Sequence, residues 1–216
     1  MGAALRDRRA ASLAAGLVCL LELQYWVVQA IAERAWALPY SLRLNYISDL
    51  GSTACGPAVC SPLAPLMNAS FVCSGALCVA AAVLLPAALA IGRWAGPAGV
   101  LLGLSGLGTA VVGLVPENVH LHPHTLAAML AFYAGNAALC VLGLGMRRRR
   151  PATGWVTVAL GVVGLLASLA FFGGHRLGVG VGAVERVAAW PLFVWLVVAS
   201  GLLLGRRPQV SEERSG

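Results

Sequence analysis

The stretch that decides the fold is AASLAAGLVCLLELQYWVVQAIA, residues 10–32, which follows three arginines between positions 6 and 9. An α-helix needs about 20 apolar residues to cross a bilayer, and this run is long enough. The alternative is a signal peptide with residues 30–32 as its cleavage site, but the apolar region of a signal peptide has only about 7 to 15 residues. We therefore expect residues 10–32 to form a retained membrane-spanning helix.

The composition extends this interpretation to the whole chain. Of 216 residues, 59% are hydrophobic and 11% are charged, whereas about a quarter of the residues of a soluble domain are charged. Five further apolar runs have spanning length, namely residues 68–91, 97–115, 125–145, 155–172 and 187–205. Six spans use about 120 positions and leave no room for a soluble domain. We expect an all-α, polytopic membrane protein with one domain of six transmembrane helices over residues 10–205 and a long outer loop between helices 1 and 2.

The arginines predict how the chain is oriented, and none of the 15 basic residues is a lysine. Eleven arginines flank one set of span ends, namely Arg6, Arg8, Arg9, Arg93, Arg147, Arg148, Arg149, Arg150, Arg206, Arg207 and Arg214. The other four are Arg34, Arg43, Arg176 and Arg186. Because cytoplasmic loops carry the excess of arginine, we expect a plasma-membrane protein whose termini, residues 1–9 and a disordered tail over 206–216, are cytoplasmic. These short clusters form no basic face, so the net charge of +7 does not indicate a nucleic-acid partner.

Small residues recur at helix-packing spacings in two of the expected spans. Gly99 and Gly103 form a GxxxG motif, and Gly161 and Gly164 lie one turn apart. Small residues let helix backbones approach each other in a bilayer, where no hydrophobic force drives helices together. We expect these glycines to lie at helix–helix contacts.

A carboxyl group near the middle of the first span is costly in a bilayer, so Glu22 is expected to be protonated, hydrogen-bonded or facing a cavity. Glu22, Trp26, Gln29 and Glu33 share one helical stripe that should face the bundle. Asn136, near the middle of the fourth span, is the best-placed amide to meet Glu22. A neutral, hydrogen-bonded Glu22 is favoured over the proton-binding site of a coupled transporter, because no intramembrane base or cation accompanies it.

The expected outer loop between the first two spans contains Cys55 and Cys60. Both face an oxidising compartment in this topology, so a disulfide between them is plausible. A loop of this length is expected to fold back over the helices. The remaining cysteines lie within spans and are expected to be small buried apolar residues, namely Cys19, Cys73, Cys78 and Cys140.

The second outer loop and the start of its helix contain His120, His122 and His124. This alternation could bind zinc with Glu117 or Asp49 completing the site. No HExxH pair and no pattern of supporting residues accompanies the histidines, however. A polar, hydrogen-bonded lid is therefore favoured, and we expect neither a metal nor another cofactor.

The third outer loop ends with Glu185 and Arg186, just before the last apolar run. Arg186 is expected to supply the counter-ion for Asp49 or Glu117, because all three loops emerge on one side of the membrane. A single polar chamber at the outer face follows from this arrangement. Its expected members are Asn45, Ser48, Asp49, Asn68, Glu117, Asn118, His124, Glu185 and Arg186.

Four ordered motifs carry a resemblance to a known family. They are NYISDLG (45–51), SPL (61–63) with LMNASF (66–71), GLVPEN (113–118) with His124 and Phe132, and ER (185–186) with WP (190–191) and Trp195. Over nearly the whole chain they resemble the bacterial and archaeal six-helix membrane family known as domain of unknown function 998, which implies a bacterial membrane protein but no established activity. The Ile-Ser-Asp element and the spacing of His124 to Phe132 are also similar to DRAM-like and Frag-type eukaryotic membrane proteins, which are associated with lipid handling and autophagy.

Three classes of function fit these features. The leading hypothesis is a non-enzymatic protein that interacts with membrane lipids, because this needs only a helical bundle and a polar outer cap. An intramembrane lipid hydrolase, with or without zinc, would use the outer-loop histidines with Asp49 and Glu117. A small proton-coupled transporter would use Glu22 and Asn136, and a homodimer could supply further helices. No sequence feature identifies a substrate.

Overall fold

The structure, a computed structural model, describes residues 2–205, with side chains from Arg9 onward. All elements in this part of the chain are helices. In order they are α1 (Gly2–Leu21), α2 (Leu23–Arg34), the 3-10 helix η1 (Ser48–Gly51), α3 (Ala64–Leu89), the 3-10 helix η2 (Gly92–Trp94), α4 (Ala95–Leu114), α5 (Leu121–Met146), α6 (Pro151–Phe172) and α7 (Val181–Leu204). The expected tail, residues 206–216, lies outside the described residues, as do its arginines.

Six helices are long and apolar enough to cross a membrane, and this confirms the all-α fold with six spans. The first span, Arg9–Arg34, includes α2 and most of α1. Glu22 alone separates these two helices, where the Tyr25 amide donates to the Glu22 carbonyl three residues back at 3.1 Å. The helix therefore continues through this position with one tightened turn.

The helices extend further than the apolar runs that predict them. α7 begins at Val181, ahead of the expected start at 187, so Glu185 and Arg186 lie inside its first two turns. α6 begins at Pro151 and α3 has a proline in its first turn. Proline suits this position because its missing N–H would have no partner within the helix. Hydropathy marks where the chain becomes apolar. The helix begins where the N–H groups of its first turn have partners or, as with proline, are missing.

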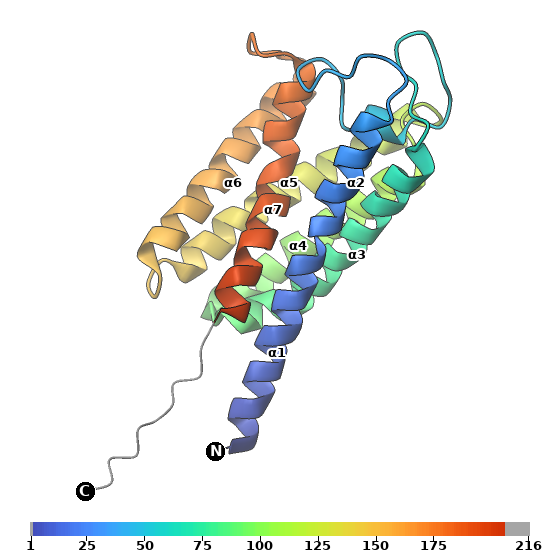
Figure 1. The fold of residues 1–216 in the computed structure, drawn as a ribbon. Coiled ribbons are helices and arrows are strands. Elements are labelled where there is room, and N and C mark those ends of the chain that lie inside the picture. Colours follow the sequence, from blue (N-terminus) through green and yellow to red (C-terminus); the bar gives the residue numbers. More distant parts are fainter. Residues whose placement is uncertain (1, 206–216) are drawn as a thin grey trace, which may run out of the picture.

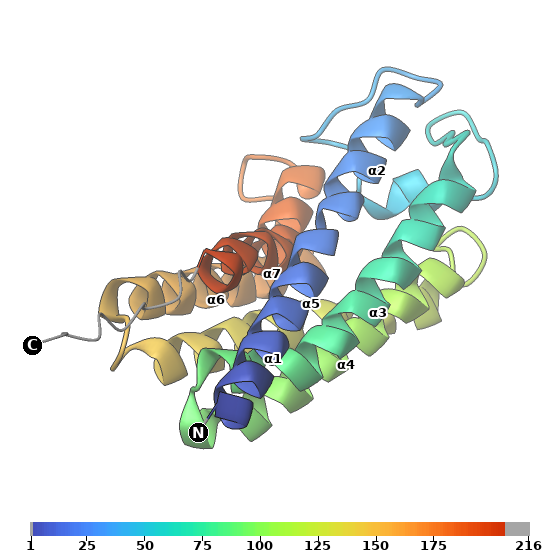
Figure 2. The ribbon, with the colours of Figure 1, turned by 60° about the horizontal axis from the view of Figure 1, so that its bottom comes forward.

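The six spans form a closed ring (Figures 1 and 2). In chain order each span packs against the next, and the first span closes the ring by packing between α3 and α7. α5 also contacts α7, on the other side of α6. Residues 35–63, 115–120 and 173–180 all lie at one end of the bundle, which we call the connection end (Figure 1).

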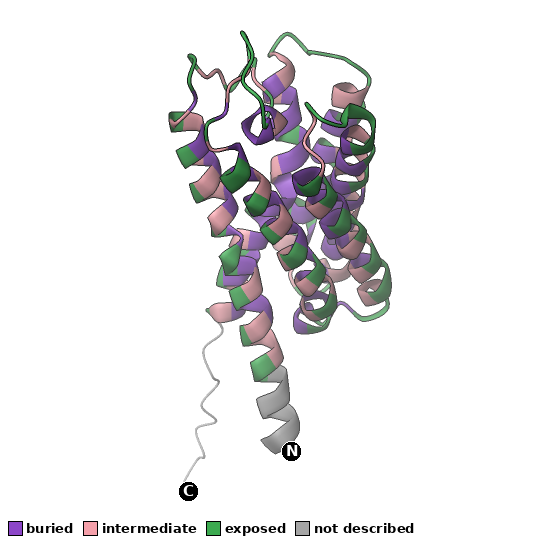
Figure 3. Cartoon of the chain, turned by 90° about the vertical axis from the view of Figure 1, so that its right-hand side faces the viewer, coloured by how far each residue is buried: buried purple, intermediate pink, exposed green. Residues whose placement is uncertain are grey.

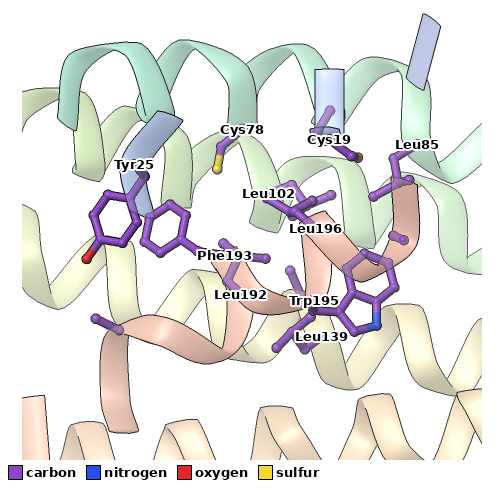
Figure 4. Packing of buried hydrophobic residues seen from close by; sticks show 14 of the residues in the cluster. Cys19, Tyr25, Cys78, Leu85, Leu102, Leu139, Leu192, Phe193, Trp195 and Leu196 are labelled. Atoms are coloured by element: carbon purple, nitrogen blue, oxygen red, sulfur yellow. The ribbon is translucent and has the colours of Figure 1, made fainter. Parts of the chain in front are cut away.

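Buried residues line the inner sides of the helices, and exposed residues cover their outer sides (Figure 3). In the core, the ring of Tyr25 stacks on Phe193 with centroids 4.7 Å apart (Figure 4). Leu102, Leu139 and Leu196 are fully buried deeper in the bundle. α2, α4, α5 and α7 thus share one apolar core.

Glycines allow the closest helix contacts. A Cβ atom on Gly99 would lie 2.9 Å from the Ala82 carbonyl oxygen of α3, and one on Gly161 would lie 2.6 Å from the Asn136 carbonyl oxygen of α5. A Cβ on Gly164 would overlap the Asn136 side-chain amide. The expected helix contacts at these glycines are therefore confirmed, whereas Gly103 is less tightly packed, with 3.8 Å to the nearest atom.

Residues 35–63, which join the first span to the second, are partly ordered by η1. Asp49, Leu50 and Gly51 of this short helix are buried against the bundle. The Ser61 hydroxyl donates to the Leu50 carbonyl oxygen at 2.7 Å, and the Asn68 amide of α3 donates to Gly51 at 2.9 Å. The segment is thus packed over the core around η1.

Candidate functional site

An acidic pair lies at the connection end. Asp49 is 6% exposed, and its Oδ2 atom accepts a hydrogen bond from the Tyr46 amide at 2.8 Å. Glu117, from residues 115–120, lies within hydrogen-bonding reach of the Asp49 carboxyl group. Burial, together with the neighbouring Glu117, raises the pKa of Asp49 from 3.8 to about 7. Asp49 therefore holds its proton more tightly than a free carboxyl group does.

Glu185 of α7 joins the same end of the bundle. Its Oε2 atom accepts a short hydrogen bond from the Ile47 amide, just before η1. Asp49 and Glu117 are its acidic neighbours. Glu185 is 4% exposed, so this bond fixes η1 to α7 in the buried part of the molecule.

Arg186 connects α7 to residues 40–45. Its Nη1 atom donates to three carbonyl oxygens, those of Leu42, Asn45 and Gly182, at 3.1, 2.9 and 3.0 Å. Its Nη2 atom donates to the Tyr40 hydroxyl and lies 3.5 Å from Glu33 Oε1. Among the described residues the guanidinium forms no ion pair with Asp49 or Glu117. The counter-ion expected for those two carboxylates instead pairs with Glu33.

The remaining polar residues expected in the chamber mostly connect segments of the chain. Asn45 accepts from the Ser41 amide at 2.9 Å, and Asn118 Oδ1 accepts from the Thr53 amide at 3.0 Å. The His124 Nδ1 atom lies 2.7 Å from the Val115 carbonyl oxygen. The last two contacts join residues 115–120 to residues 35–63 and to α5, as a hydrogen-bonded lid would require.

A small cavity of about 50 Å³ with a few polar groups in a mainly apolar lining lies beneath η1. Its walls include Ser48, His124, Glu185 and Asn136, together with apolar residues of α3, α4, α5 and α7. A water needs roughly 10 to 15 Å³ measured in this way, so the cavity has room for a few waters. It is too small for a drug-sized ligand, for which pockets of about 300 to 1,000 Å³ are usual.

The histidines do not assemble a metal site within residues 9–205. No group of three or more His, Cys, Asp or Glu side chains there lies close enough to hold a metal ion. His120 and His122 flank the start of α5, whereas His124 turns to the Val115 carbonyl oxygen. The structure therefore offers no described ligand set for a zinc-dependent hydrolase.

Glu22 and Asn136 are both buried, but they bond to different helices. Cys78 and Ser74 of α3 are the hydrogen-bonding neighbours of the Glu22 carboxyl group. The Asn136 amide nitrogen donates to the Ala188 carbonyl oxygen of α7 at 2.8 Å. No hydrogen bond joins the two side chains in the described part of the chain, so the expected pair does not form. The inward stripe on the first span is present, with Glu22 1% and Gln29 4% exposed.

Cys55 and Cys60 are joined by a disulfide that closes the tip of residues 53–60. The Gly56 amide donates to the Val59 carbonyl oxygen at 2.8 Å inside this small loop. Of the other cysteines, Cys19 and Cys78 are buried. Cys73 is exposed on the outside of α3, so it is not the buried residue expected from its place in a span.

A second hollow, which the sequence did not predict, runs between α6 and α7 on the outside of the bundle. It has a volume of about 760 Å³. Its walls are apolar side chains of the two helices, including Leu160, Val163, Ala183, Val187, Trp190 and Val194. Leu42, Arg43, Gly178 and Val179 cover its end at the connection end, and Arg186 lines it there as well. We call this hollow the α6–α7 groove.

Sequence periodicity could not identify the groove, because its shape depends on how far apart α6 and α7 pack. The one signal in the sequence is compositional. Arg43 and Arg186 belong to the few arginines on the side that the charge pattern leaves poor in them. Both line the groove.

Comparison with known proteins places the chain in a family. A family model described as Protein of unknown function (DUF998) matches residues 9–201. No curated protein and no solved structure matches the chain. The matched range includes the first five spans, the sixth span up to residue 201, η1 and the residues of the acidic pair. The chain belongs to the DUF998 family of multi-pass membrane proteins.

Proposed function

We propose that this protein binds a membrane lipid in the α6–α7 groove and carries out no chemical reaction on it. The observation that supports the proposal is the groove itself, an apolar hollow of about 760 Å³ between two membrane-spanning helices. Its volume falls in the range of about 300 to 1,000 Å³ that is usual for small-molecule sites. A groove on the outer surface of a membrane bundle faces acyl chains, which match its apolar walls.

The groove also has two chemically different ends. Along α6 and α7 its walls are mainly valine, leucine and alanine, with Trp190 among them, whereas its end at the connection end holds Arg43 and Arg186. Arginine side chains reach from the edge of the apolar region to the level of the lipid head groups. An acyl chain in the apolar part would therefore place its head group at the polar end.

The proposal includes an orientation, with the connection end outside the cell, both termini cytoplasmic and the protein in the plasma membrane. The arginine distribution supports it, because eleven of 15 arginines then lie on the cytoplasmic side. The disulfide at the connection end fits an oxidising compartment. The groove then opens toward the outer leaflet.

Bound lipid is measured directly by native mass spectrometry of the protein released from its membranes in mild detergent. We expect one lipid to remain bound to the natural chain and to be lost from Val163→Trp, which places an indole in the groove. Val162→Trp is the matched control, because Val162 is also an exposed valine of α6 but does not line the groove. Equal lipid retention in the two variants, or none in the natural chain, would refute the proposal.

A further inference from the structure

The groove opens at its polar end beside two arginines from different connections. We propose that the bound lipid is an anionic phospholipid, with its phosphate group between Arg43 and Arg176 and one acyl chain along α6 and α7. This inference rests on the lipid binding proposed above and adds the class of lipid.

The two arginines share one surface depression. Arg43, Leu44, Arg176, Gly178 and Gly180 line a hollow of about 340 Å³ at the connection end. Arg43 and Gly178 also line the α6–α7 groove, so the two hollows adjoin. A phosphate in the depression and an acyl chain in the groove are therefore positions that one lipid molecule can occupy together.

Hydrogen bonds to backbone carbonyl oxygens hold the depression in shape. The Arg43 Nη2 atom donates to the Gly178 carbonyl oxygen at 2.8 Å, and the Gly182 amide donates to the Arg43 carbonyl oxygen at 3.0 Å. Gly180 has a φ of +97°, and a Cβ there would overlap the Arg43 carbonyl oxygen. Glycine at this position lets residues 173–180 approach residues 42–44 closely enough for both arginines to line one hollow.

Both arginines are free to bind an anion. Arg43 and Arg176 are exposed, and neither forms an ion pair with a described acidic side chain. A guanidinium has five N–H donors, and the structure uses Nη2 of Arg43 for one hydrogen bond. Phosphate oxygens accept several such donors at once. The pair therefore provides uncompensated positive charge where a head group would lie.

Arg186 gives an independent indication of a missing acceptor. Its side chain is 4% exposed and lines the groove, and its Nε atom is buried with no hydrogen-bond partner among the described residues. Leaving a buried donor without an acceptor is unfavourable. A lipid ester or phosphate oxygen at the polar end of the groove is an acceptor of the kind this N–H lacks.

The surroundings of the arginines fit a membrane interface. Large apolar side chains flank each of them and are half or more exposed, namely Leu42 (50%), Leu44 (63%), Leu177 (66%) and Val179 (50%). In water such a patch would be unfavourable. At the boundary of a bilayer the apolar side chains contact acyl chains while the arginines reach the phosphates. The source of the anion is therefore the bilayer itself.

The inference is tested in nanodiscs that contain equal amounts of phosphatidylglycerol and phosphatidylcholine, with the lipid retained after release identified by native mass spectrometry. We expect the natural chain to retain phosphatidylglycerol preferentially. Arg43→Gln and Arg176→Gln should each lower this preference by about fivefold, the effect of one basic residue near an anionic surface. Arg34→Gln is the matched control, because Arg34 is an exposed arginine at the same end that lines neither hollow.

The outcomes separate this inference from the proposed function. Retention of both lipids equally, or a preference unchanged in both arginine variants, would refute the anionic site while leaving lipid binding intact. If Arg34→Gln lowers the preference as much as Arg43→Gln and Arg176→Gln do, the preference comes from the overall positive charge, and this would also refute the site. An excess of inorganic phosphate should not displace the lipid, because the acyl chain anchors it. Displacement would show a site for a soluble anion instead. The proposed function itself is refuted if the natural chain retains no lipid, or if Val163→Trp and Val162→Trp retain equal amounts.

Discussion

The Arg186 Nη2 atom lies 3.5 Å from Glu33 Oε1, and this ion pair connects the start of α7 to the end of α2. Gln29 supports it, since its amide donates to the same Glu33 oxygen at 2.7 Å. The pair is the only one among the described residues. It joins the first span to the last at the connection end, whereas most of the packing between these spans is through α1.

Arg186→Ala is expected to lower the free energy of unfolding by about 3 kcal/mol, the low end of the range for breaking a buried ion pair, because Glu33 is 22% exposed. Arg186→Lys should recover only part of this loss, since an ammonium group cannot reach the Leu42, Asn45 and Gly182 carbonyl oxygens together. Thermal unfolding in detergent measures both effects.

The choice of partner is tested by double-mutant cycles. Arg186→Gln and Glu33→Gln should show a coupling of about 1 to 3 kcal/mol, whereas Arg186→Gln and Asp49→Asn should be additive within about 0.5 kcal/mol. A larger coupling to Asp49 than to Glu33 would restore the counter-ion arrangement that the sequence predicts.

The acidic pair makes stability depend on pH. Asp49 has a pKa of about 7 in the folded chain, against 3.8 when unperturbed, mainly because it is buried and secondly because of Glu117. The folded state therefore binds the proton more tightly, so the contribution of Asp49 to stability is fully present below pH 3.8 and is lost as the pH rises to about 7.

Asp49→Asn should flatten this part of the pH profile and raise the unfolding temperature at pH 8, because asparagine can still accept from the Tyr46 amide. Glu117→Gln should reduce the slope without removing it, since the burial of Asp49 remains. Unfolding temperatures measured between about pH 4 and pH 8 would contradict the raised pKa of Asp49 if Asp49→Asn and the natural chain had parallel profiles.

The sequence predicted the number of spans and the meeting of three connections at one end of the bundle. Long apolar runs depend on local composition, and every second connection between spans must lie at the same end. The sequence did not predict where α7 begins. Glu185 and Arg186 were expected just before the helix, but the chain continues the helix through them. The Glu185 side chain accepts from the Ile47 amide, and the Arg186 Nη1 atom donates to carbonyl oxygens. These partners belong to distant segments and leave no mark in local sequence.

Partner choice was likewise beyond sequence reasoning. Depth along the helices favoured Asn136 as the partner of Glu22, but rotation about the helix axes turns Glu22 toward α3 and Asn136 toward α6 and α7. The depth of a residue along its helix can be counted from residue numbers. The direction in which its side chain points around the helix axis depends on which helices are neighbours in the ring. The α6–α7 groove was missed for the same reason.

The orientation of the chain is tested by cysteine labelling. Val119→Cys and Arg148→Cys place single thiols at opposite ends of the bundle, both at exposed positions. With the exposed Cys73 replaced, an impermeant reagent added outside cells should label position 119 and spare position 148. The reverse pattern would invert the proposed topology.

The disulfide between Cys55 and Cys60 is expected to be present in protein from the native membrane. Alkylation before and after reduction, followed by intact-mass analysis, counts the thiols that reductant releases. Two additional alkyl groups after reduction are expected. Full alkylation of both cysteines without reductant would show instead that the connection end is not held in the oxidised form.

Lipid binding in the α6–α7 groove is tested most directly by a high-resolution density map of the protein in phosphatidylglycerol nanodiscs. We expect an elongated acyl-chain density between Val163 of α6 and Val187 of α7, ending in a phosphate density beside Arg43 and Arg176. A map in which α6 and α7 close against each other along this length, or in which the groove holds no ordered lipid, would contradict the proposed function.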